Sequence, residues 1–423
     1  MLTIKYLYPA ALVIISIAVY FPSLGNDFMS LWDDQWVVMN HYTESGFTWE
    51  NFWAIMTEFY NGQYAPFNEL LYMSLHSMFG YDAFAFHLAG LLLHIANVCL
   101  VYFCVSKLLE ISHIQKRMTV SFLTALIFAV HPVNVESVAW MSASKVLVYA
   151  FFYLSATYTF LLYLQTKRVH YYIITLLLFF ASFLGKEQAV TFPLWILLIY
   201  VITGHSLKDK KIWRQTAPFL ILALVEGIIT MISQSDDGTV HFEGYPVWQR
   251  IVYACYTLIE YFVKTVAPFK LSYLYPFPSQ PDDPLPLWLL IYPALIAIML
   301  FGLGTWIYKH KPLFFSLLFF TIHIAVALHL ISLDRFAVVA DRYVYVSSIG
   351  IAFVISWYVV KYIYVKKYAK IMFTCMLTYV IYLGWYANIR THTWHDSDTL
   401  KKEIRDLLKQ RNDYQNKHVI DFK

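Results

Sequence analysis

The stretch FAFHLAGLLLHIANVCLVYFCVSK, residues 84–107, contains no charged side chain before Lys107. About 20 consecutive apolar residues are enough for a helix to cross the hydrocarbon core of a bilayer. This stretch therefore predicts a membrane-spanning helix and indicates that the chain is a membrane protein.

Comparable apolar runs recur along the whole chain of 423 residues, of which 59% are hydrophobic and 14% charged. A soluble domain is about one-quarter charged, so this composition excludes an ordinary soluble enzyme. The four cysteines show no metal-ligand or disulfide spacing, and a net charge of +4 does not indicate nucleic-acid binding. We expect an all-α polytopic membrane protein with about eleven transmembrane helices, at residues 3–22, 84–107, 119–139, 144–164, 171–185, 189–203, 216–232, 286–308, 313–331, 344–362 and 371–389.

The basic residues predict the orientation of these helices, because cytoplasmic loops carry an excess of Lys and Arg. Five linkers together hold 15 of the 31 Lys and Arg residues, at 107–117, 167–168, 208–214, 309–311 and 361–370. With these linkers in the cytoplasm, the N-terminus is inside and the C-terminus outside. The large first loop, 23–83, and a second large loop, 233–285, are then external.

Residues 251–268 are apolar and nearly long enough to span, but they contain Glu260 and Lys264. A crossing here would place Lys309 and Lys311 outside and invert the charge pattern that follows. We therefore expect an external or half-buried helix.

The first external loop has eight acidic residues and neither Lys nor Arg. We expect it to carry short amphipathic helices, such as one within 47–60. Its adjacent pair, Asp33 and Asp34, lies between Trp32 and Trp36. Neighbouring carboxylates beside bulky apolar groups repel each other and resist solvation, which raises the basicity of one of them. Such a carboxylate can deprotonate an attacking alcohol, and binding of a divalent metal is the other chemical use of paired acids.

A few basic residues lie on the predicted external side at the ends of spans. Lys145, Lys186 and Arg342 are embedded in apolar sequence, and the last two are adjacent to Glu187 and Asp341. Charges at membrane depth are costly and commonly mark a substrate path, although a snorkelling lysine or a structural ion pair is the alternative. Gathered on one face, the three cations could hold a lipid phosphate.

Histidines and one acid lie within or at the ends of the predicted spans. His87 and His94 share one helix face, and His131 precedes Pro132 with Glu136 five residues on. Membrane histidines commonly only bond a neighbouring helix, so no metal ligands are assigned, whereas His131 and Glu136 are candidates for shaping the site. Glu226 in the middle of 216–232 indicates a functional site or a protonated acid bonded to another helix.

Several of these segments, in this order, resemble the TMTC proteins, transmembrane O-mannosyltransferases with tetratricopeptide repeats, and more broadly glycosyltransferase superfamily C (GT-C). The resemblance covers about residues 20–400. After the acidic pair, the segments that carry it are YAPFNELLYMSL (64–75), FGYDAFAFHLAGLLLHIANV (79–98), HPVNVESVAW (131–140), LGKEQAVTFP (184–193) and ADRYVYVSSIG (340–350).

The resemblance implies a role for each matching residue. Asp33 and Asp34 match the acidic pair that supplies the catalytic base. Lys186 and Arg342 lie in matching segments, and we expect them to bind the donor phosphate together with Lys145, which lies in a segment that departs from the family and could supply the positive charge that is missing there. The supporting or substrate-binding residues it implies are His87, His94, His131, Glu136, Glu187, Asp341 and Tyr345. Two local departures are MSASKVL (141–147), where the family has an Arg-Asp-like pair, and Gly185 in place of a serine.

The leading functional hypothesis is an inverting glycosyltransferase that moves one sugar, such as mannose, from a polyprenyl-phosphate donor to a hydroxyl of a protein or glycan. No cofactor is assigned to this reaction, because nothing in the sequence supports a divalent metal. The sequence also has no nucleotide-binding motif, which suits a lipid-linked donor. A transporter or flippase of lipid-linked sugar is the alternative, although no inverted repeat supports it. A non-catalytic membrane scaffold is the third hypothesis.

Residues 1–389 are expected to form one GT-C-like domain, followed by a short polar external tail, 390–423. The family's repeats have no counterpart in this sequence, so a separate repeat-containing partner is a possibility and acceptor selection is open. The expected location is a bacterial inner membrane with a periplasmic active face, or the endoplasmic reticulum membrane in a eukaryote.

Overall fold

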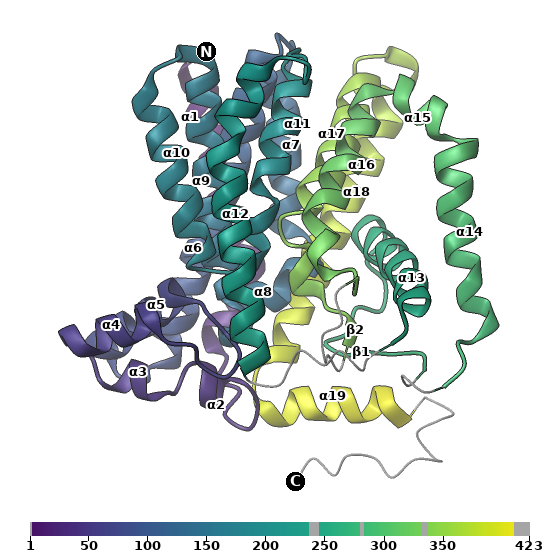
Figure 1. Cartoon of the computed structure of the whole chain (residues 1–423). Helices are drawn as coiled ribbons and strands as arrows, with labels where there is room; N and C mark the ends of the chain where they lie inside the picture. The colour runs from purple at the N-terminus through teal and green to yellow at the C-terminus, as the bar shows by residue number, and fades with distance from the viewer. Residues whose placement is uncertain (1, 237–244, 280–282, 331–336, 410–423) are drawn as a thin grey trace.

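The computed structural model describes residues 2–236, 245–279, 283–330 and 337–409. Arg335, an external basic residue in the predicted topology, and the end of the tail, 410–423, lie outside the described residues. The described chain is almost entirely helical, and its long helices run side by side (Figure 1). This confirms the expected all-α polytopic fold.

Helices correspond to all eleven predicted spans. Five helices are long and apolar enough to cross a membrane on their own, one further span is a bent pair, and five shorter apolar helices account for the rest of the described bundle. The bundle consists of α1 (Leu2–Tyr20), α6 (Ala83–Ile111), α7 (Arg117–Val130), α9 (Lys145–Thr166), α10 (Val169–Phe183), α11 (Phe192–Ile202), α12 (Lys210–Asp236), α14 (Ile291–Ala297) with the π-helical η6 (Ile298–Gly302) and α15 (Gly304–Lys309), α16 (Lys311–Ile324), α17 (Ser348–Ile363) and α18 (Lys366–Thr391).

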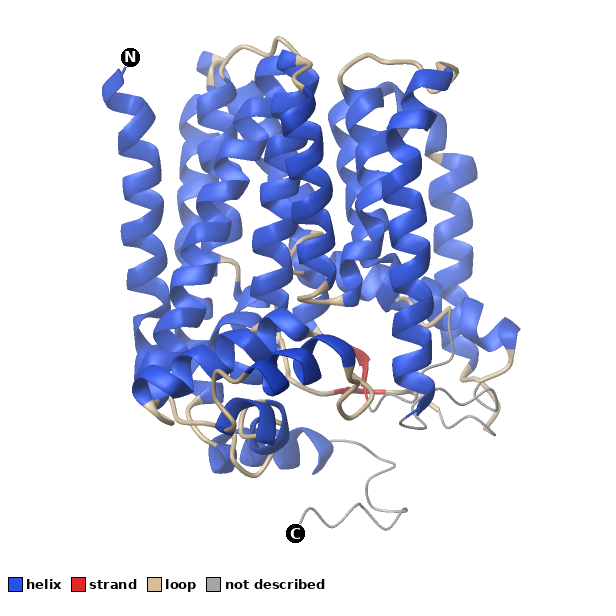
Figure 2. Cartoon of the chain, turned by 60° about the vertical axis from the view of Figure 1, so that its left-hand side comes forward, coloured by secondary structure: helices blue, strands red, loops and turns tan. Residues whose placement is uncertain are grey.

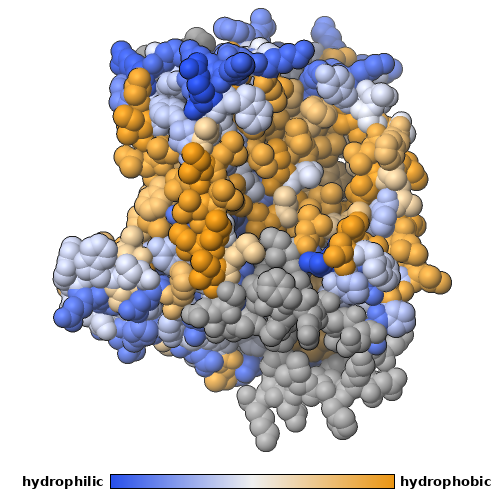
Figure 3. All heavy atoms as spheres, in the orientation of Figure 1, coloured by the Kyte–Doolittle hydropathy of each residue, from blue (hydrophilic) through white to orange (hydrophobic). Residues whose placement is uncertain are grey.

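The two ends of the bundle differ in chemistry. The five linkers rich in Lys and Arg lie at the same end as the N-terminus, which we call the basic end, and the longer connections lie at the other, the loop end (Figure 2). In Figure 3, polar residues gather along the basic end and apolar residues cover the middle of the visible face. This distribution is that of a protein whose middle band faces lipid.

The loop end carries short elements. They are η1 (Phe21–Gly25), α2 (Asp34–Val37), α3 (His41–Glu44), α4 (Trp49–Thr57), α5 (Pro66–Phe79), η2 (Pro132–Asn134), α8 (Val135–Ala139), η3 (Met141–Ala143), η4 (Glu187–Thr191), α13 (Val247–Val266), η5 (Leu287–Leu290), η7 (Ala325–Ala327), η8 (Asp341–Val344), η9 (His392–Trp394), α19 (Ser397–Lys409) and the antiparallel pair β1 (Tyr275–Pro276) and β2 (Ala337–Val339). The first loop shares a small core with the start of α6 and with η3, in which Tyr72, Phe86 and Met141 are buried.

The predicted span at 119–139 is broken rather than straight. The helix bends by 53° between α7 and the segment Pro132–Ala139. Proline lacks the N–H that continues a helix and disfavours helical geometry in the residue before it, and His131 accordingly has extended backbone angles. The segment 131–144 therefore runs across the loop end before α9 begins.

Helix α13 contains the ambiguous stretch 251–268. It packs against α14 and β2, and the chain enters and leaves it at the loop end (Figure 1). Its two charged side chains, Glu260 and Lys264, pair with each other at 3.4 Å. An amphipathic helix with an internal ion pair can lie along the bundle without crossing the membrane.

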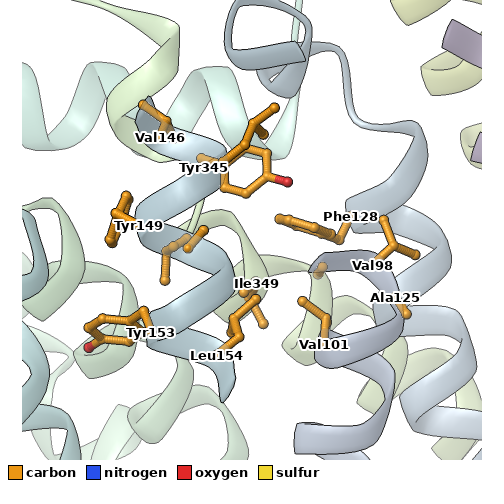
Figure 4. Packing of buried hydrophobic residues seen from close by; sticks show 14 of the residues in the cluster. Val98, Val101, Ala125, Phe128, Val146, Tyr149, Tyr153, Leu154, Tyr345 and Ile349 are labelled. Carbon is orange, nitrogen blue, oxygen red and sulfur yellow. The ribbon is translucent and has the colours of Figure 1, made fainter. Parts of the chain in front are cut away.

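The largest core cluster lies where α6, α7, α9 and α17 meet. Figure 4 shows Phe128, Tyr149, Tyr153 and Tyr345 packed among smaller aliphatic residues of these helices. Because α9 is buried along most of its length, its first residue, Lys145, is held in a fixed place at the loop end.

Candidate active site

A cavity of about 230 Å³ lies at the loop end, beneath the bundle. Segments that are far apart in sequence contribute to it: the start of α2, the loop between α4 and α5, the segment 131–144, the start of α9, η4, the end of α12 and η8. Its lining residues are Asp33, Val37, Asn61, Gly62, Gln63, Tyr64, Ala65, Trp140, Ser142, Lys145, Gly185, Lys186, Glu187, Thr230, Ser233, Gln234, Arg342 and Tyr343.

The two adjacent aspartates have different environments. Asp33 is half-buried and lines the cavity. Asp34 is buried, and its carboxylate accepts hydrogen bonds from the backbone N–H of Met29 at 2.8 Å and of Ser142 at 2.9 Å, as well as from the Ser142 hydroxyl. Asp34 thus ties the first loop to the segment 131–144 and leaves Asp33 as the carboxylate of the pair that faces the cavity.

The charge state of Asp33 reflects two opposing effects. Burial raises the pKa of its carboxyl group, while the positive charges of Lys145 and Arg342 act to lower it. The result is a pKa above the ordinary value for aspartate. A carboxylate that is poorly solvated but still near cations is a stronger base than a surface aspartate.

Lys145 and Lys186 reach the cavity from different elements. Lys186 is 4% exposed, lies 3.6 Å from Glu187 Oε1 and faces the ring of Tyr343. The ammonium of Lys145 donates a hydrogen bond to Gln63 Oε1. Both lysines therefore have polar contacts, and the carboxylate that Lys186 faces, Glu187, is itself partly exposed.

Arg342 has the best-defined geometry of the three cations. The buried carboxylate of Glu136 accepts from the Arg342 backbone N–H at 3.1 Å through Oε2 and from its guanidinium at 2.5 Å through Oε1. The guanidinium also lies 5.5 Å from the ring centre of Trp140 and 5.2 Å from that of Tyr343. These contacts fix its plane, and a fixed guanidinium can bind a phosphate through paired hydrogen bonds.

Gly185 explains how two of the cations come together. A Cβ atom at this position would lie 2.7 Å from the backbone nitrogen of Tyr149, one turn after Lys145 on α9. Only glycine permits this close approach between the end of α10 and the first turn of α9. The glycine that replaces the family's serine therefore has a steric reason in this chain.

Besides Glu136, five of the residues predicted to support substrate binding do not line the cavity. His94 Nδ1 lies 2.8 Å from the Tyr345 hydroxyl, and Tyr345 is buried in the core (Figure 4). His131 Nε2 lies 2.8 Å from the carbonyl oxygen of Thr265, which joins the break after α7 to α13. His87 is fully buried within α6.

Asp341 is the fifth of these residues. It pairs with Arg390 at 3.4 Å and accepts a hydrogen bond from the Tyr275 hydroxyl at 3.0 Å. Burial raises the pKa of Asp341 while Arg390 lowers it. The cavity thus combines Asp33, Lys145, Lys186, Glu187 and Arg342, with Glu136 directly behind Arg342, and the remaining predicted residues lie outside it.

Sequence reasoning missed most of the uncharged polar lining. Gln63 and Tyr64 belong to the turn NGQYAP (61–66), whose Asn-Gly pair indicates a turn but no chemistry. Ser142 and the α12 residues Thr230 and Ser233 carry no local signal, because hydroxyls are common in membrane helices. Within the described residues no group of three or more His, Cys, Asp and Glu side chains is arranged to hold a metal ion.

Comparisons with known proteins show what the chain is similar to. No family model matches the chain. A protein O-mannosyl-transferase of Caenorhabditis elegans, F38B6.6, is 26% identical over 200 residues, which are 45% of this chain and 27% of that protein. The chain thus matches about a quarter of the length of this curated relative.

A solved structure of 14% identity indicates a similar fold. The archaeal oligosaccharyltransferase AglB of Archaeoglobus fulgidus, in complex with an inhibitory peptide and a dolichol-phosphate, has a TM-score of 0.50 at 14% identity and covers 97% of this chain and 59% of its own. ArnT of Cupriavidus metallidurans, bound to undecaprenyl phosphate, has a TM-score of 0.47 at 13% identity, and the match covers 83% of this chain and 59% of ArnT. The expected GT-C-like fold and the resemblance to the O-mannosyltransferases are confirmed.

Proposed function

We propose that this protein is a membrane glycosyltransferase that moves a sugar from a polyprenyl-phosphate donor to a hydroxyl group of a protein or glycan. The observation that carries the proposal is the cavity at the loop end, in which the Asp33 carboxylate faces the same space as Lys145, Lys186 and Arg342. A base and an anion-binding group in one cavity at the boundary of the bundle are what transfer from a lipid phosphate requires.

The proposed reaction is a single displacement. Asp33 accepts the proton of the acceptor hydroxyl as its oxygen attacks the anomeric carbon of the donor sugar. The bond between that carbon and the phosphate oxygen breaks, and its electron pair leaves with the polyprenyl phosphate. Attack from the side opposite the phosphate inverts the anomeric centre.

The three cations stabilise the charge that develops on the leaving phosphate. Arg342 is held in place by Glu136, so it can donate paired hydrogen bonds without first reorganising. Lys186 and Lys145 add positive charge from the η4 and α9 sides. This arrangement favours the transition state, in which the phosphate carries more charge than in the donor.

The donor and the acceptor are inferred from similarity as well as chemistry. AglB of this fold contains a dolichol-phosphate and a peptide, and the matching relative is a protein O-mannosyl-transferase. A polyprenyl-phosphate sugar, with mannose as the first to test, and a protein or glycan hydroxyl acceptor are consistent with both. The active face would be the loop end, opposite the basic linkers.

The test uses the purified full chain in lipid nanodiscs, with radiolabelled polyprenyl-phosphate mannose, glucose and galactose and a pool of hydroxyl acceptors. We expect sugar transfer by the wild type and loss of transfer in Asp33→Asn with the thermal unfolding midpoint unchanged. Glu58→Gln, which alters an acid of the same loop that does not line the cavity, is the matched control. Movement of these lipids across a vesicle membrane without sugar transfer would instead support the transporter hypothesis.

A further inference from the structure

The cavity has a second wall that the phosphate chemistry does not use. The cations come from α9, η4 and η8, whereas the loop between α4 and α5 and the end of α12 contribute only uncharged polar side chains. These are Asn61, Gln63, Tyr64, Thr230, Ser233 and Gln234, which we call the neutral wall.

Helix α12 presents hydroxyl groups to the cavity. Thr230 and Ser233 lie one turn apart, so they share a helix face. The Thr230 hydroxyl donates to the carbonyl oxygen of Glu226 at 2.9 Å, which leaves its lone pairs to accept a hydrogen bond. Ser233 is 1% exposed, and its Oγ has no hydrogen-bond partner in the described part of the chain.

A buried hydroxyl without a partner is unfavourable, and a polar group of a ligand can satisfy it. Ser233 lines the cavity that already contains the proposed base and phosphate-binding cations. The partner it lacks is therefore expected to be a polar group of whatever occupies that cavity.

Gln63 links the two walls. Its Oε1 accepts a hydrogen bond from Lys145, which leaves the amide nitrogen of the same side chain to donate to a neighbouring group. A ligand whose phosphate lies near Lys145 would place one of the groups attached to that phosphate next to Gln63. The phosphate of a polyprenyl-phosphate sugar carries the lipid chain and the sugar ring, and of these two the sugar ring is the one that can hydrogen-bond to an amide.

We propose that the neutral wall binds the hydroxyl groups of the donor sugar, with Ser233 and Thr230 on α12 as specificity-determining residues. This inference rests on the proposed function and extends it to the class of sugar. An uncharged, hydroxyl-rich sugar such as a hexose suits a wall of hydroxyls and amides. A site that bonds a hydroxyl rejects an analogue lacking it, because its own polar group is then left unpaired.

The experiment compares Ser233→Ala and Thr230→Val with the wild type, using the best hexose donor and its 2-, 3-, 4- and 6-deoxy analogues. Each lost hydrogen bond should lower kcat/KM for the parent donor by about 5- to 50-fold. The same variant should leave unchanged the rate with the one deoxy donor that lacks the contacted hydroxyl. Inhibition by sugar-free polyprenyl phosphate should be unaffected in both variants.

Thr166→Val is the matched control, since the Thr166 hydroxyl also donates to a carbonyl one turn back but lies exposed at the basic end. Equal losses with all deoxy donors, or a parallel loss of polyprenyl-phosphate inhibition, would overturn the inference while leaving the proposed function standing. Failure of the wild type to transfer sugar from any donor would overturn both.

Discussion

Glu136 holds Arg342 at two points, accepting one hydrogen bond from its backbone N–H and another from its guanidinium. The carboxylate is fully buried, whereas the arginine reaches the cavity. The pair thus connects the segment between α7 and α9 to η8, which follows it by some 200 residues in the chain.

Replacing Glu136 by glutamine should reduce both stability and donor binding. Removing one partner of a buried ion pair leaves an uncompensated charge and costs up to about 3–5 kcal/mol. We expect a lower thermal unfolding midpoint in detergent and a higher KM for the donor. Arg342→Lys, which keeps the charge but not the paired geometry, should lose about tenfold in kcat/KM while retaining more of the stability. Equal unfolding midpoints for wild type and Glu136→Gln would contradict this role.

Substitutions of Asp33 and Asp34 should have different effects, one on turnover and the other on the stability of the first loop. Asp33→Asn should lower kcat by about 10²- to 10⁴-fold, because it removes the general base, and should leave the fold intact. Asp34→Asn should destabilise the first loop by about 1–3 kcal/mol, because the amide cannot accept all the hydrogen bonds from Met29 and Ser142. Turnover and limited proteolysis of the first loop measure the two effects. If Asp34→Asn abolished turnover without loosening the loop, and Asp33→Asn only loosened the loop, Asp34 would be the base.

Acidification should inactivate the enzyme at a pH above the usual range for aspartate. Burial raises the pKa of Asp33, and only the ionised form, which prevails above that pKa, can act as the base. The charge of Lys145 counteracts this shift, so Lys145→Gln should move the acidic limb of the kcat/KM profile to still higher pH. A limb that stays in place in Lys145→Gln would exclude Asp33 as the titrating group.

Glu69 on α5 should make the first loop less stable as the pH rises. Burial raises its pKa from 4.5 to about 7, so between these values the unfolded chain loses the proton while the folded chain keeps it. The free energy of unfolding should therefore fall with increasing pH through this window, by about 1–3 kcal/mol, and stay lower above it. Glu69→Gln should flatten this dependence in unfolding curves measured from pH 4.5 to 8; an unchanged slope would show that another group is responsible.

Gly185→Ala should disturb the site although it adds only a methyl group. The new Cβ would meet the backbone of Tyr149 at 2.7 Å, so α10 and Lys186 must move away from α9. We expect a loss of about 1–3 kcal/mol in stability and a raised donor KM. Gly227→Ala is the control, since nothing lies within 4 Å of its added Cβ. Equal stability and equal donor KM in the two variants would show that the contact between Gly185 and Tyr149 is not sterically restricted.

The membrane fold could be predicted from sequence because apolar length and the placement of Lys and Arg act locally. The run at 84–107 became α6, and all five basic linkers lie at one end of the bundle. Glu260 and Lys264, which argued against a crossing at 251–268, form an ion pair on α13. These features depend on neighbouring residues alone.

The site was only partly predictable, because its selection of residues depends on tertiary contacts. Asp33 and Asp34 are equivalent in sequence, and the hydrogen bonds that Asp34 accepts from Met29 and Ser142 distinguish them. His94 and Tyr345 lie in segments that resemble the family's motifs, yet they bond to each other in the core. The hydroxyl of Ser233 carries no signal until α12 meets the cavity.

The bend at His131 has a consequence for how the site can move. The segment that follows it, 131–144, contains both Glu136, which holds Arg342, and Ser142, which holds the loop of Asp33. One stretch of backbone therefore sets the spacing between Asp33, the proposed base, and Arg342, which is proposed to bind the leaving phosphate. In the proposed reaction, a shift of this segment would move Asp33 and Arg342 together, so the distance between the base and the phosphate would change little.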